Sequence, residues 1–458
     1  MKSTIKEKPR ALLVAIKTPK VSDIDSEESL HELERLVTTL GFDVVAKEFQ
    51  KRPNTKNITV VGEGKLKHLA EYTGGPGIVE RGNFAKKSKA ALKIEEEKNV
   101  DEAFEADSLD PDLDIIDLPK ADIVVFDCDL SPAQMRNLES ALGVEILDRS
   151  GVIIEIFSRH ARTRAAKLQV EIARLKYLAP RLRETGGGSE RQAGRGSGES
   201  SLELDRRNIR DRVTELKTEL LQVQKEQEGR RSVRSDQLSV ALIGYTNAGK
   251  SSTMRALTGS EVLVEDKLFA TLDTTVRALH PETHPRILIS DTVGFIKKLP
   301  HDLVASFKST LDEALNAFLL LYVVDASDPN YPSQLEITKE VLSQVGVKNT
   351  QSYIIFNKSD RLTEEEKTSL KENFPQAIVM SSRNPDDIKK LREIILSAFE
   401  KDMLEEDVFA AYNVTGIVGD IRSNMRVIKE SYENLGVRLR VRARPADLHR
   451  LKKKYHLT

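Results

Sequence analysis

The sequence predicts an α/β protein built around a mostly parallel sheet with helices on both faces. Three observations support this fold class. An apolar strand, a glycine-rich loop and a helical stretch follow one another from residue 238 to residue 258. Further short apolar runs alternate with helical patterns before and after that unit, which is typical of layered α/β domains. Two long amphipathic helical patterns separate the halves of the chain, and 458 residues suggest about three domains.

Composition excludes several protein classes. Hydrophobic residues make up 39% and charged residues 31%, which favours a soluble globular protein, and a net charge of -1 provides no overall attraction to nucleic acid. No apolar run approaches the ~20 residues of a membrane helix, and the first ten residues lack the apolar region of a signal peptide. The single cysteine, Cys128, excludes an internal disulfide framework and indicates a reducing cytoplasm. We expect it to be a small core residue.

Residues 1–160 are predicted to form an N-terminal α/β domain. Its expected strands are Arg10–Ile16, Phe42–Phe49, Ala121–Asp127 and Val144–Leu147. Its expected helices are Glu27–Leu40, Gly64–Tyr72 and a helix that runs to Leu142, capped by Ser131 with Pro132 in its first turn.

A charged insertion, Gly74–Lys120, interrupts this domain. It opens with glycines, continues with lysines and ends with acidic residues. We expect a mobile, solvated segment, because charge runs are usually solvated; a partner-binding arm is the alternative.

Residues 161–235 are predicted to form an antiparallel helical hairpin. Apolar stripes mark both helices: Leu168, Ile172, Leu175 and Leu178 on Thr163–Leu182, and Val213, Leu216, Leu220 and Val223 on Leu202–Gly229. The joining loop, residues 185–201, is rich in glycine and carries Arg191 and Arg195. Helix connections usually need only ~2–8 residues. The loop is therefore expected to have a function, and its arginines suit a phosphate-rich partner such as RNA; a flexible connector is the alternative.

The third predicted domain, residues 236–401, begins with a phosphate-binding loop. The apolar strand Leu238–Ile243 leads into Gly244-Tyr-Thr-Asn-Ala-Gly249-Lys250-Ser251, and a helical stretch follows. In this strand–loop–helix setting, backbone N–H groups and the helix N-terminus face phosphates. Lys250 should reach the β- and γ-phosphates, and the Ser251 hydroxyl should bind Mg²⁺.

Two further motifs identify the nucleotide. Asp291-Thr-Val-Gly294 follows a strand, so Asp291 should lie near Mg²⁺ and the Gly294 amide should face the γ-phosphate. Asn357-Lys358-Ser359-Asp360 follows the apolar strand Ser352–Phe356. A carboxylate at Asp360 accepts from both N1–H and N2–H₂ of guanine, and adenine offers no such donor pair. Ser381 and Ser382 fit the last guanine loop, and together the motifs predict a GTPase.

Two positions near the phosphates leave alternatives open. Thr271 is the favoured threonine for completing the Mg²⁺ shell in the first switch, with Thr275 as the alternative. Asn247 either holds a potassium ion, as in related GTPases, or is a loop residue that tolerates positive φ.

Phe295 stands directly after Gly294, where many GTPases place the glutamine that orients the attacking water. A phenyl ring cannot orient water, so the free protein should hydrolyse GTP slowly.

Residues 402–458 are predicted to form a small C-terminal α/β domain with a strand–helix–strand–helix pattern. Arg438, Arg440, Arg442 and Arg444 alternate with apolar residues, so they should share one strand face. This face is either a basic contact surface or a solvated exterior.

The whole chain resembles the HflX family of GTPases, within the Obg–HflX group. Beyond the nucleotide motifs, the resemblance rests on segments that begin at Gly62 (GEGKL), Leu130 (LSPAQMRNLE), Ala161 (ARTR), Lys167 (KLQVE), Leu175 (LKYL), Leu202 (LELDRR), Phe269 (FATLD) and Asp291 (DTVGFI). It implies the four-part organisation predicted above, binding to the large ribosomal subunit and, in some members, splitting of stalled or idle ribosomes. In this sequence the glycine-rich loop has Gly196-Ser-Gly-Glu-Ser-Ser201 in place of the family's Gly-Pro-Gly-Glu-Thr-Gln, and the insertion Gly74–Lys120 is atypical.

The motifs, together with the resemblance to the HflX family, therefore predict a monomeric, cytoplasmic, ribosome-associated GTPase that uses Mg²⁺. It also uses potassium if Asn247 holds a monovalent ion rather than serving only as a loop residue. Its partners are GTP or GDP and the large ribosomal subunit with its RNA. The expected catalytic residues are Lys250, Thr271 and Gly294. The expected GTP-binding residues are Gly244, Tyr245, Thr246, Asn247, Ala248, Gly249, Lys250, Ser251, Ser252, Phe269, Thr271, Asp291, Gly294, Asn357, Lys358, Asp360, Ser381 and Ser382. The alternatives are an RNA-binding assembly factor that uses nucleotide only as a switch, and a small-molecule kinase, which the Asn357–Asp360 motif disfavours.

Overall fold

The computed structural model describes ten segments of the chain: residues 8–19, 21–79, 119–182, 201–232, 238–260, 268–269, 274–298, 315–347, 350–401 and 403–457. They divide into two compact units, each described by itself below. The first comprises Met1–Arg159 and Ala173–Val213, and the second His160–Ile172 and Thr214–Thr458. Most of the predicted insertion Gly74–Lys120 and of the loop 185–201 lies outside the described residues, as does Thr271.

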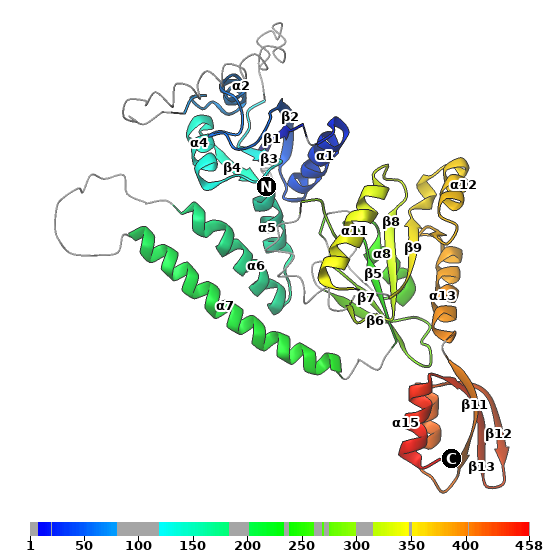
Figure 1. Ribbon diagram of the computed structural model, residues 1–458. Coiled ribbons are helices and arrows are strands. Elements are labelled where there is room, and N and C mark those ends of the chain that lie inside the picture. The colour runs from blue at the N-terminus through cyan, green and yellow to red at the C-terminus, as the bar shows by residue number, and fades with distance from the viewer. Residues whose placement is uncertain are drawn as a thin grey trace, which may run out of the picture. The chain divides into compact units, whose positions relative to one another are not determined.

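The N-terminal sheet is four-stranded and fully parallel, in the order β2-β1-β3-β4 (Figure 1). Its strands are β1 (Arg10–Lys17), β2 (Asp43–Lys51), β3 (Ile123–Phe126) and β4 (Glu145–Asp148). Its helices are α1 (Asp23–Thr39), α2 (Glu63–Thr73), α4 (Pro132–Leu142) and α5 (Arg149–His160). Ser131 caps α4, as the local sequence predicts, and the structure adds a full capping box with Gln134. Cys128 is only half-buried, at the margin of the domain core.

Helix α5 has no counterpart among the elements predicted from the sequence. Its β-branched run from Val152 to Ile154 favours strands, and Gly151 disfavours a helix. The helix forms because Val152, Ile153, Ile156 and Phe157 are all fully buried. Tertiary packing therefore overrides the local preference here.

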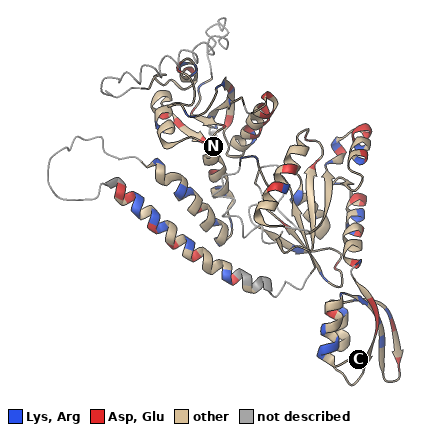
Figure 2. Ribbon diagram, in the orientation of Figure 1, with Lys and Arg blue, Asp and Glu red and all other residues tan. Residues whose placement is uncertain are grey.

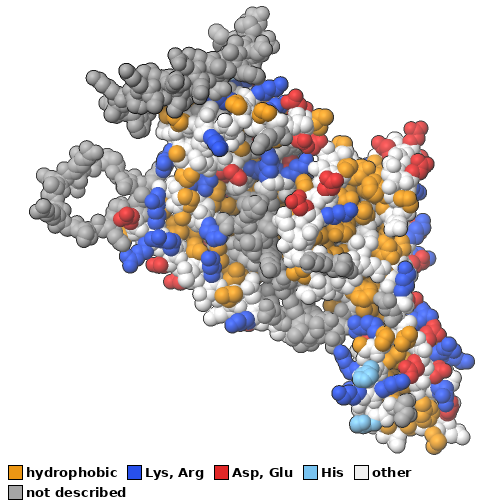
Figure 3. Space-filling model, in the orientation of Figure 1, with side chains coloured by type: hydrophobic (Ala, Val, Ile, Leu, Met, Phe, Trp, Pro, Cys, Tyr) orange, Lys and Arg blue, Asp and Glu red, His pale blue; other side chains and the backbone are white. Residues whose placement is uncertain are grey.

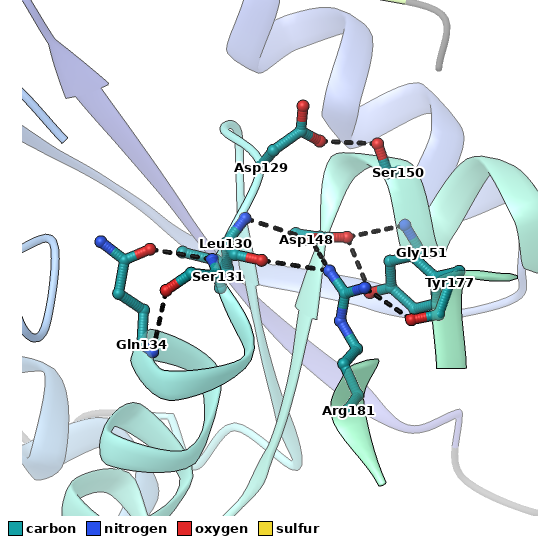
Figure 4. A network of polar contacts seen from close by, with 9 residues as sticks. All are labelled: Asp129, Leu130, Ser131, Gln134, Asp148, Ser150, Gly151, Tyr177 and Arg181. Atoms are coloured by element: carbon teal, nitrogen blue, oxygen red, sulfur yellow. Dashed lines mark hydrogen bonds and ion pairs between the residues drawn. The ribbon is translucent and has the colours of Figure 1, made fainter. Parts of the chain in front are cut away.

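Hydrogen bonds to Asp148, at the end of β4, connect the start of α5 and the end of α6 (Arg164–Leu178) to this sheet (Figure 4). One carboxylate oxygen accepts from the Gly151 amide at 2.7 Å and from the Tyr177 hydroxyl at 2.8 Å. The other accepts from the Leu130 amide at 3.2 Å and from Arg181 at 2.9 Å. Asp148 is fully buried, so these four donors stabilise a charge that would otherwise be costly there.

The predicted hairpin is formed by α6, the short 3₁₀ helix η1 (Ala179–Arg181) and α7 (Ser201–Ser232), which run antiparallel (Figure 1). Arg164 near the start of α6 pairs with Glu219 in the later part of α7 at 2.6 Å. Of the predicted stripes, Leu168, Ile172, Leu216 and Val223 are buried, whereas Leu178 is exposed. Basic and acidic side chains alternate along α7 (Figure 2).

The central domain has a six-stranded sheet in the order β10-β9-β8-β5-β7-β6, parallel except for the antiparallel edge strand β6. Its strands are β5 (Leu238–Ile243), β6 (Thr275–Ala278), β7 (Ile287–Asp291), β8 (Leu319–Asp325), β9 (Gln351–Asn357) and β10 (Ile378–Val379). Its helices are α8 (Lys250–Thr258), α11 (Tyr331–Val345), the 3₁₀ helix η2 (Ser359–Arg361), α12 (Glu364–Asn373) and α13 (Pro385–Glu400). The predicted mostly parallel sheet is confirmed.

The C-terminal domain packs a three-stranded antiparallel sheet, in the order β11-β13-β12, against two helices. Its elements are β11 (Leu404–Ala411), α14 (Ile417–Asn424), β12 (Arg426–Glu433), β13 (Gly436–Ala443) and α15 (Pro445–Tyr455). The predicted pattern of strand, helix, strand and helix is wrong in one respect. Its second strand is in fact two strands, β12 and β13, which form a hairpin. A tight turn around Leu435 separates them, which the strand pattern from 426 to 443 conceals.

The arginines of β13 do share one face, but acidic neighbours neutralise it. Val437, Leu439, Val441 and Ala443 are buried on the opposite face. Arg438 pairs with Glu433, Arg440 and Arg442 both pair with Glu405, and Arg444 pairs with Asp447. Figure 3 shows basic and acidic side chains intermixed over this domain. The pairing favours the solvated exterior over the basic contact surface. Among the described residues, no helix has the length and apolar character needed to span a membrane.

Candidate nucleotide site

The predicted phosphate loop connects the carboxyl end of β5 to the start of α8. Two of its glycines are required by close packing. A Cβ on Gly244 would lie 2.0 Å from the Val323 carbonyl oxygen, and one on Gly249, whose φ is +96°, would lie 2.1 Å from the Asn357 side chain. Only glycine lets this backbone pass so close to its neighbours. Ala248 is buried, and Ser252 lies half-buried in the first turn of α8.

Lys250 is buried at the centre of this loop. Its ammonium donates to the Gly244 carbonyl at 3.1 Å and to the Tyr245 carbonyl at 2.8 Å. Burial lowers the Lys250 pKa to about 8, and the nearby Asp291 carboxylate opposes part of that shift. A buried cation with two carbonyl partners is suited to receive an anionic ligand.

Ser251 and Asp291 converge, although 40 positions separate them in the chain. The Ser251 hydroxyl donates to an Asp291 carboxylate oxygen at 2.6 Å, and Asp291 is fully buried at the end of β7. Two oxygen ligands beside the phosphate loop form an arrangement suited to Mg²⁺.

Asn357 and Lys358, the first two residues of the Asn357–Asp360 motif, are held in place by contacts with neighbouring loops. Asn357 is fully buried; it donates to the Ala248 carbonyl at 3.0 Å and accepts from the Ser382 amide at 2.9 Å. It therefore connects the phosphate loop to the last predicted loop. Lys358, with φ +61°, forms an ion pair of 2.6 Å with Asp325 at the end of β8.

Asp360 is oriented by the adjacent loop. The Ser381 hydroxyl donates to it at 2.6 Å, and Arg383 lies 3.9 Å away. The hydrogen bond from Ser381, more than the nearby arginines, lowers the Asp360 pKa. The carboxylate stays ionised at neutral pH and can accept two hydrogen bonds from a base.

The predicted first switch is only partly described. Thr271 lies outside the described residues, and Thr275 pairs with Asp291 across β6 and β7. Phe269 is buried and has φ +60°. Asn247 also has a positive φ of 60°, which its short polar side chain tolerates.

The segment after Asp291 returns to the phosphate loop. Gly294 lies beside Thr246 and Lys250. Phe295 is buried, and its backbone forms a parallel β-bridge with Tyr245. No polar side chain stands at position 295 to orient water.

The structure therefore gathers the described motifs at the carboxyl edge of one sheet. Sequence reasoning missed two partners: Asp325, which pairs with Lys358, and Asp387, which accepts from the Ser381 amide at 2.9 Å. An acidic residue ending the apolar strand Leu319–Asp325 was an available signal for the first.

Comparisons with known proteins agree with this geometry. Three family models match consecutive parts of the chain: a "GTP-binding GTPase N-terminal" region at residues 27–78 and 108–158, a "GTP-binding GTPase Middle Region" at 160–234, and a "50S ribosome-binding GTPase" at 239–358. A GTPase HflX from Gluconacetobacter diazotrophicus is 55% identical over 445 residues, which cover 97% of both chains. The chain belongs to the HflX family of GTPases.

A second HflX relative shares less of its sequence with this chain. The GTPase HflX of Escherichia coli is 36% identical over 374 residues, covering 80% of this chain and 77% of its own. Among solved structures, a GTP-binding protein from Sulfolobus solfataricus in complex with GDP has 22% identity and a TM-score of 0.41, covering 86% of this chain and 99% of its own. As an HflX-family member, the protein binds guanine nucleotides and hydrolyses GTP.

Proposed function

We propose that GTP binds along the carboxyl edge of the central sheet, with its phosphates on the loop from Gly244 to Ser252 and its base against Asn357, Lys358 and Asp360. The convergence of Ser251 and Asp291 at 2.6 Å carries this proposal, because it brings two oxygen atoms of the kind that Mg²⁺ prefers next to the buried Lys250. Mg²⁺ would neutralise charge on the phosphates, with Ser251, Asp291 and a switch threonine as its protein ligands.

In this arrangement Lys250 holds the β- and γ-phosphates, and the Gly294 amide faces the γ-phosphate. Asp360 and the loop of Ser381 and Ser382 select guanine. Water then attacks the γ-phosphorus in line, and the chain contributes mainly position and charge.

We further propose that this cytoplasmic protein acts as a monomer on the large ribosomal subunit and separates stalled or idle ribosomes. Two observations support a ribosomal partner. The family model over residues 239–358 describes ribosome-binding GTPases. The helix α7 exposes Arg206, Lys217 and Lys225 beside acidic residues, directly after the arginine-containing loop predicted to contact RNA. The alternative is an assembly factor in which nucleotide acts only as a switch.

Purified large ribosomal subunits are expected to raise kcat for GTP hydrolysis at least about 10-fold, equivalent to about 1.4 kcal/mol of barrier. The reason is Phe295, which leaves the free protein without a side chain at that position to orient water; groups supplied by partners accelerate other GTPases by ~10³–10⁵-fold. Single-turnover phosphate release, with and without each subunit, measures the effect.

Small subunits serve as the control and should stimulate less. The variant Phe295→Gln should not restore fast intrinsic turnover, because Phe295 is buried and the space around it is shaped for a phenyl ring. Fast hydrolysis by the free wild-type protein, unaffected by subunits, would refute partner activation. Slow hydrolysis that subunits do not stimulate, although they bind, would favour the switch-only alternative.

Potassium should accelerate hydrolysis relative to sodium if Asn247 holds a monovalent ion beside the phosphates. Rates in matched KCl and NaCl, for the wild type and Asn247→Ser, test this. Equal rates in both salts would assign Asn247 to its backbone role alone, for which its φ of 60° is already sufficient reason.

A further inference from the structure

The phosphate loop and the segment after Gly294 are joined by strand-like hydrogen bonds. Regular pairing of β5 with β7 ends at Leu242 and Asp291, and a bridge between Tyr245 and Phe295 resumes it. Between these two pairs, the segment after β5 advances three residues (242 to 245), and the segment after β7 advances four (291 to 295). The extra residue makes the Asp291–Gly294 segment bulge. The Thr246 amide donates to the Phe295 carbonyl at 2.8 Å, and the Phe295 amide donates to the Gly244 carbonyl at 3.2 Å.

A third hydrogen bond extends this connection and comes from a side chain. The Lys297 amide donates to the Tyr245 hydroxyl at 2.6 Å. Tyr245 is only 6% exposed, so water competes little for this contact. We call these three hydrogen bonds the Tyr245 latch. Two of them use only backbone atoms; the third depends on one phenol oxygen and can be removed by substitution.

The latch holds Gly294 against Lys250. A Cβ built on Gly294 would lie 2.8 Å from the Thr246 Cα and 3.0 Å from the Lys250 ammonium. The space there is therefore too small for a methyl group. A γ-phosphate is larger than a methyl group and must contact the same ammonium. Gly294 and a γ-phosphate would therefore compete for the space beside this ammonium, and moving Gly294 out of that space would strain the latch.

We propose that Tyr245 is a positioning residue that holds the segment from Asp291 to Lys297, which follows β7, in the position belonging to the protein without a γ-phosphate. The inference rests on the proposed phosphate site at Gly244–Ser252. The latch adds stability to the nucleotide-free and GDP-bound states and none to the GTP-bound state. A group that stabilises one state shifts the equilibrium by its differential contribution, so the Tyr245 hydroxyl favours GDP over GTP.

The variant Tyr245→Phe tests this, because it deletes the oxygen and keeps the ring. Fluorescent GDP and a fluorescent non-hydrolysable GTP analogue are titrated into the full-length wild type and variant with Mg²⁺. We expect the affinity for the analogue, relative to the affinity for GDP, to rise about fivefold, which is the effect of one net hydrogen bond. Hydrogen exchange at the Lys297 amide of the GDP-bound protein should become faster in the variant.

Tyr353→Phe is the matched control: it removes a hydroxyl from the same domain, one that contacts the exposed Gln351 at 3.3 Å, and should leave both affinities unchanged. An unchanged ratio of the two affinities in Tyr245→Phe overturns the latch, as does weaker binding of the analogue. Equal loss of both nucleotides also overturns it, since that pattern indicates only a distorted loop. If the wild type binds neither nucleotide, the phosphate site itself is wrong, so the two failures are distinguishable.

Discussion

Replacing Lys250 with alanine is expected to weaken GTP binding by about 100-fold or more. The Lys250 ammonium is the buried cation at the phosphate loop, and charge-assisted hydrogen bonds contribute about 1.5–3 kcal/mol each. Two of them, to the β- and γ-phosphates, account for a loss of this size. Isothermal titration with GTP measures it.

The same substitution should leave the fold intact. Burial disfavours the charged form of Lys250, as its lowered pKa shows, so its removal takes little stability from the protein without nucleotide. A circular dichroism melt checks this. Lys339→Ala, on the exposed side of α11, is the control and should change neither property. Undiminished GTP affinity in Lys250→Ala would remove this residue from the phosphate site.

The variant Asp360→Asn is expected to lose GTP affinity by about 10-fold to 100-fold and to gain binding of xanthosine triphosphate. The Ser381 hydroxyl donates to Asp360 at 2.6 Å, and an asparagine can keep its oxygen on that hydroxyl. Its NH₂ group then faces the base. Two donors oppose each other at the guanine amine, a mismatch of about 1–3 kcal/mol, whereas xanthine presents a carbonyl oxygen that accepts.

Competition of both triphosphates against fluorescent GDP measures the change of preference. Asp386→Asn, in the exposed first turn of α13, alters charge nearby without touching the base and should keep the preference for GTP. If Asp360→Asn binds GTP as tightly as the wild type, another group selects the base.

The sequence determined those features whose parts are neighbours in the chain. The strand–loop–helix unit around Gly249 and the helix cap at Ser131 are local patterns, and the structure has both. The alternation of arginines along β13 likewise follows from the two-residue period of a strand. In each case, backbone geometry over a few residues decides the outcome.

Only the tertiary structure decided how distant parts meet. Helix α5 forms against its local preference because its apolar residues are buried, and Glu405 neutralises arginines that the sequence alone presents as a basic stripe. Asp325 reaches Lys358, and the Tyr245 hydroxyl reaches the Lys297 amide 52 positions away, because parallel pairing brings strand ends together. A side chain's partner across a sheet depends on strand order and register, and neither can be read from the residues that flank it in the chain.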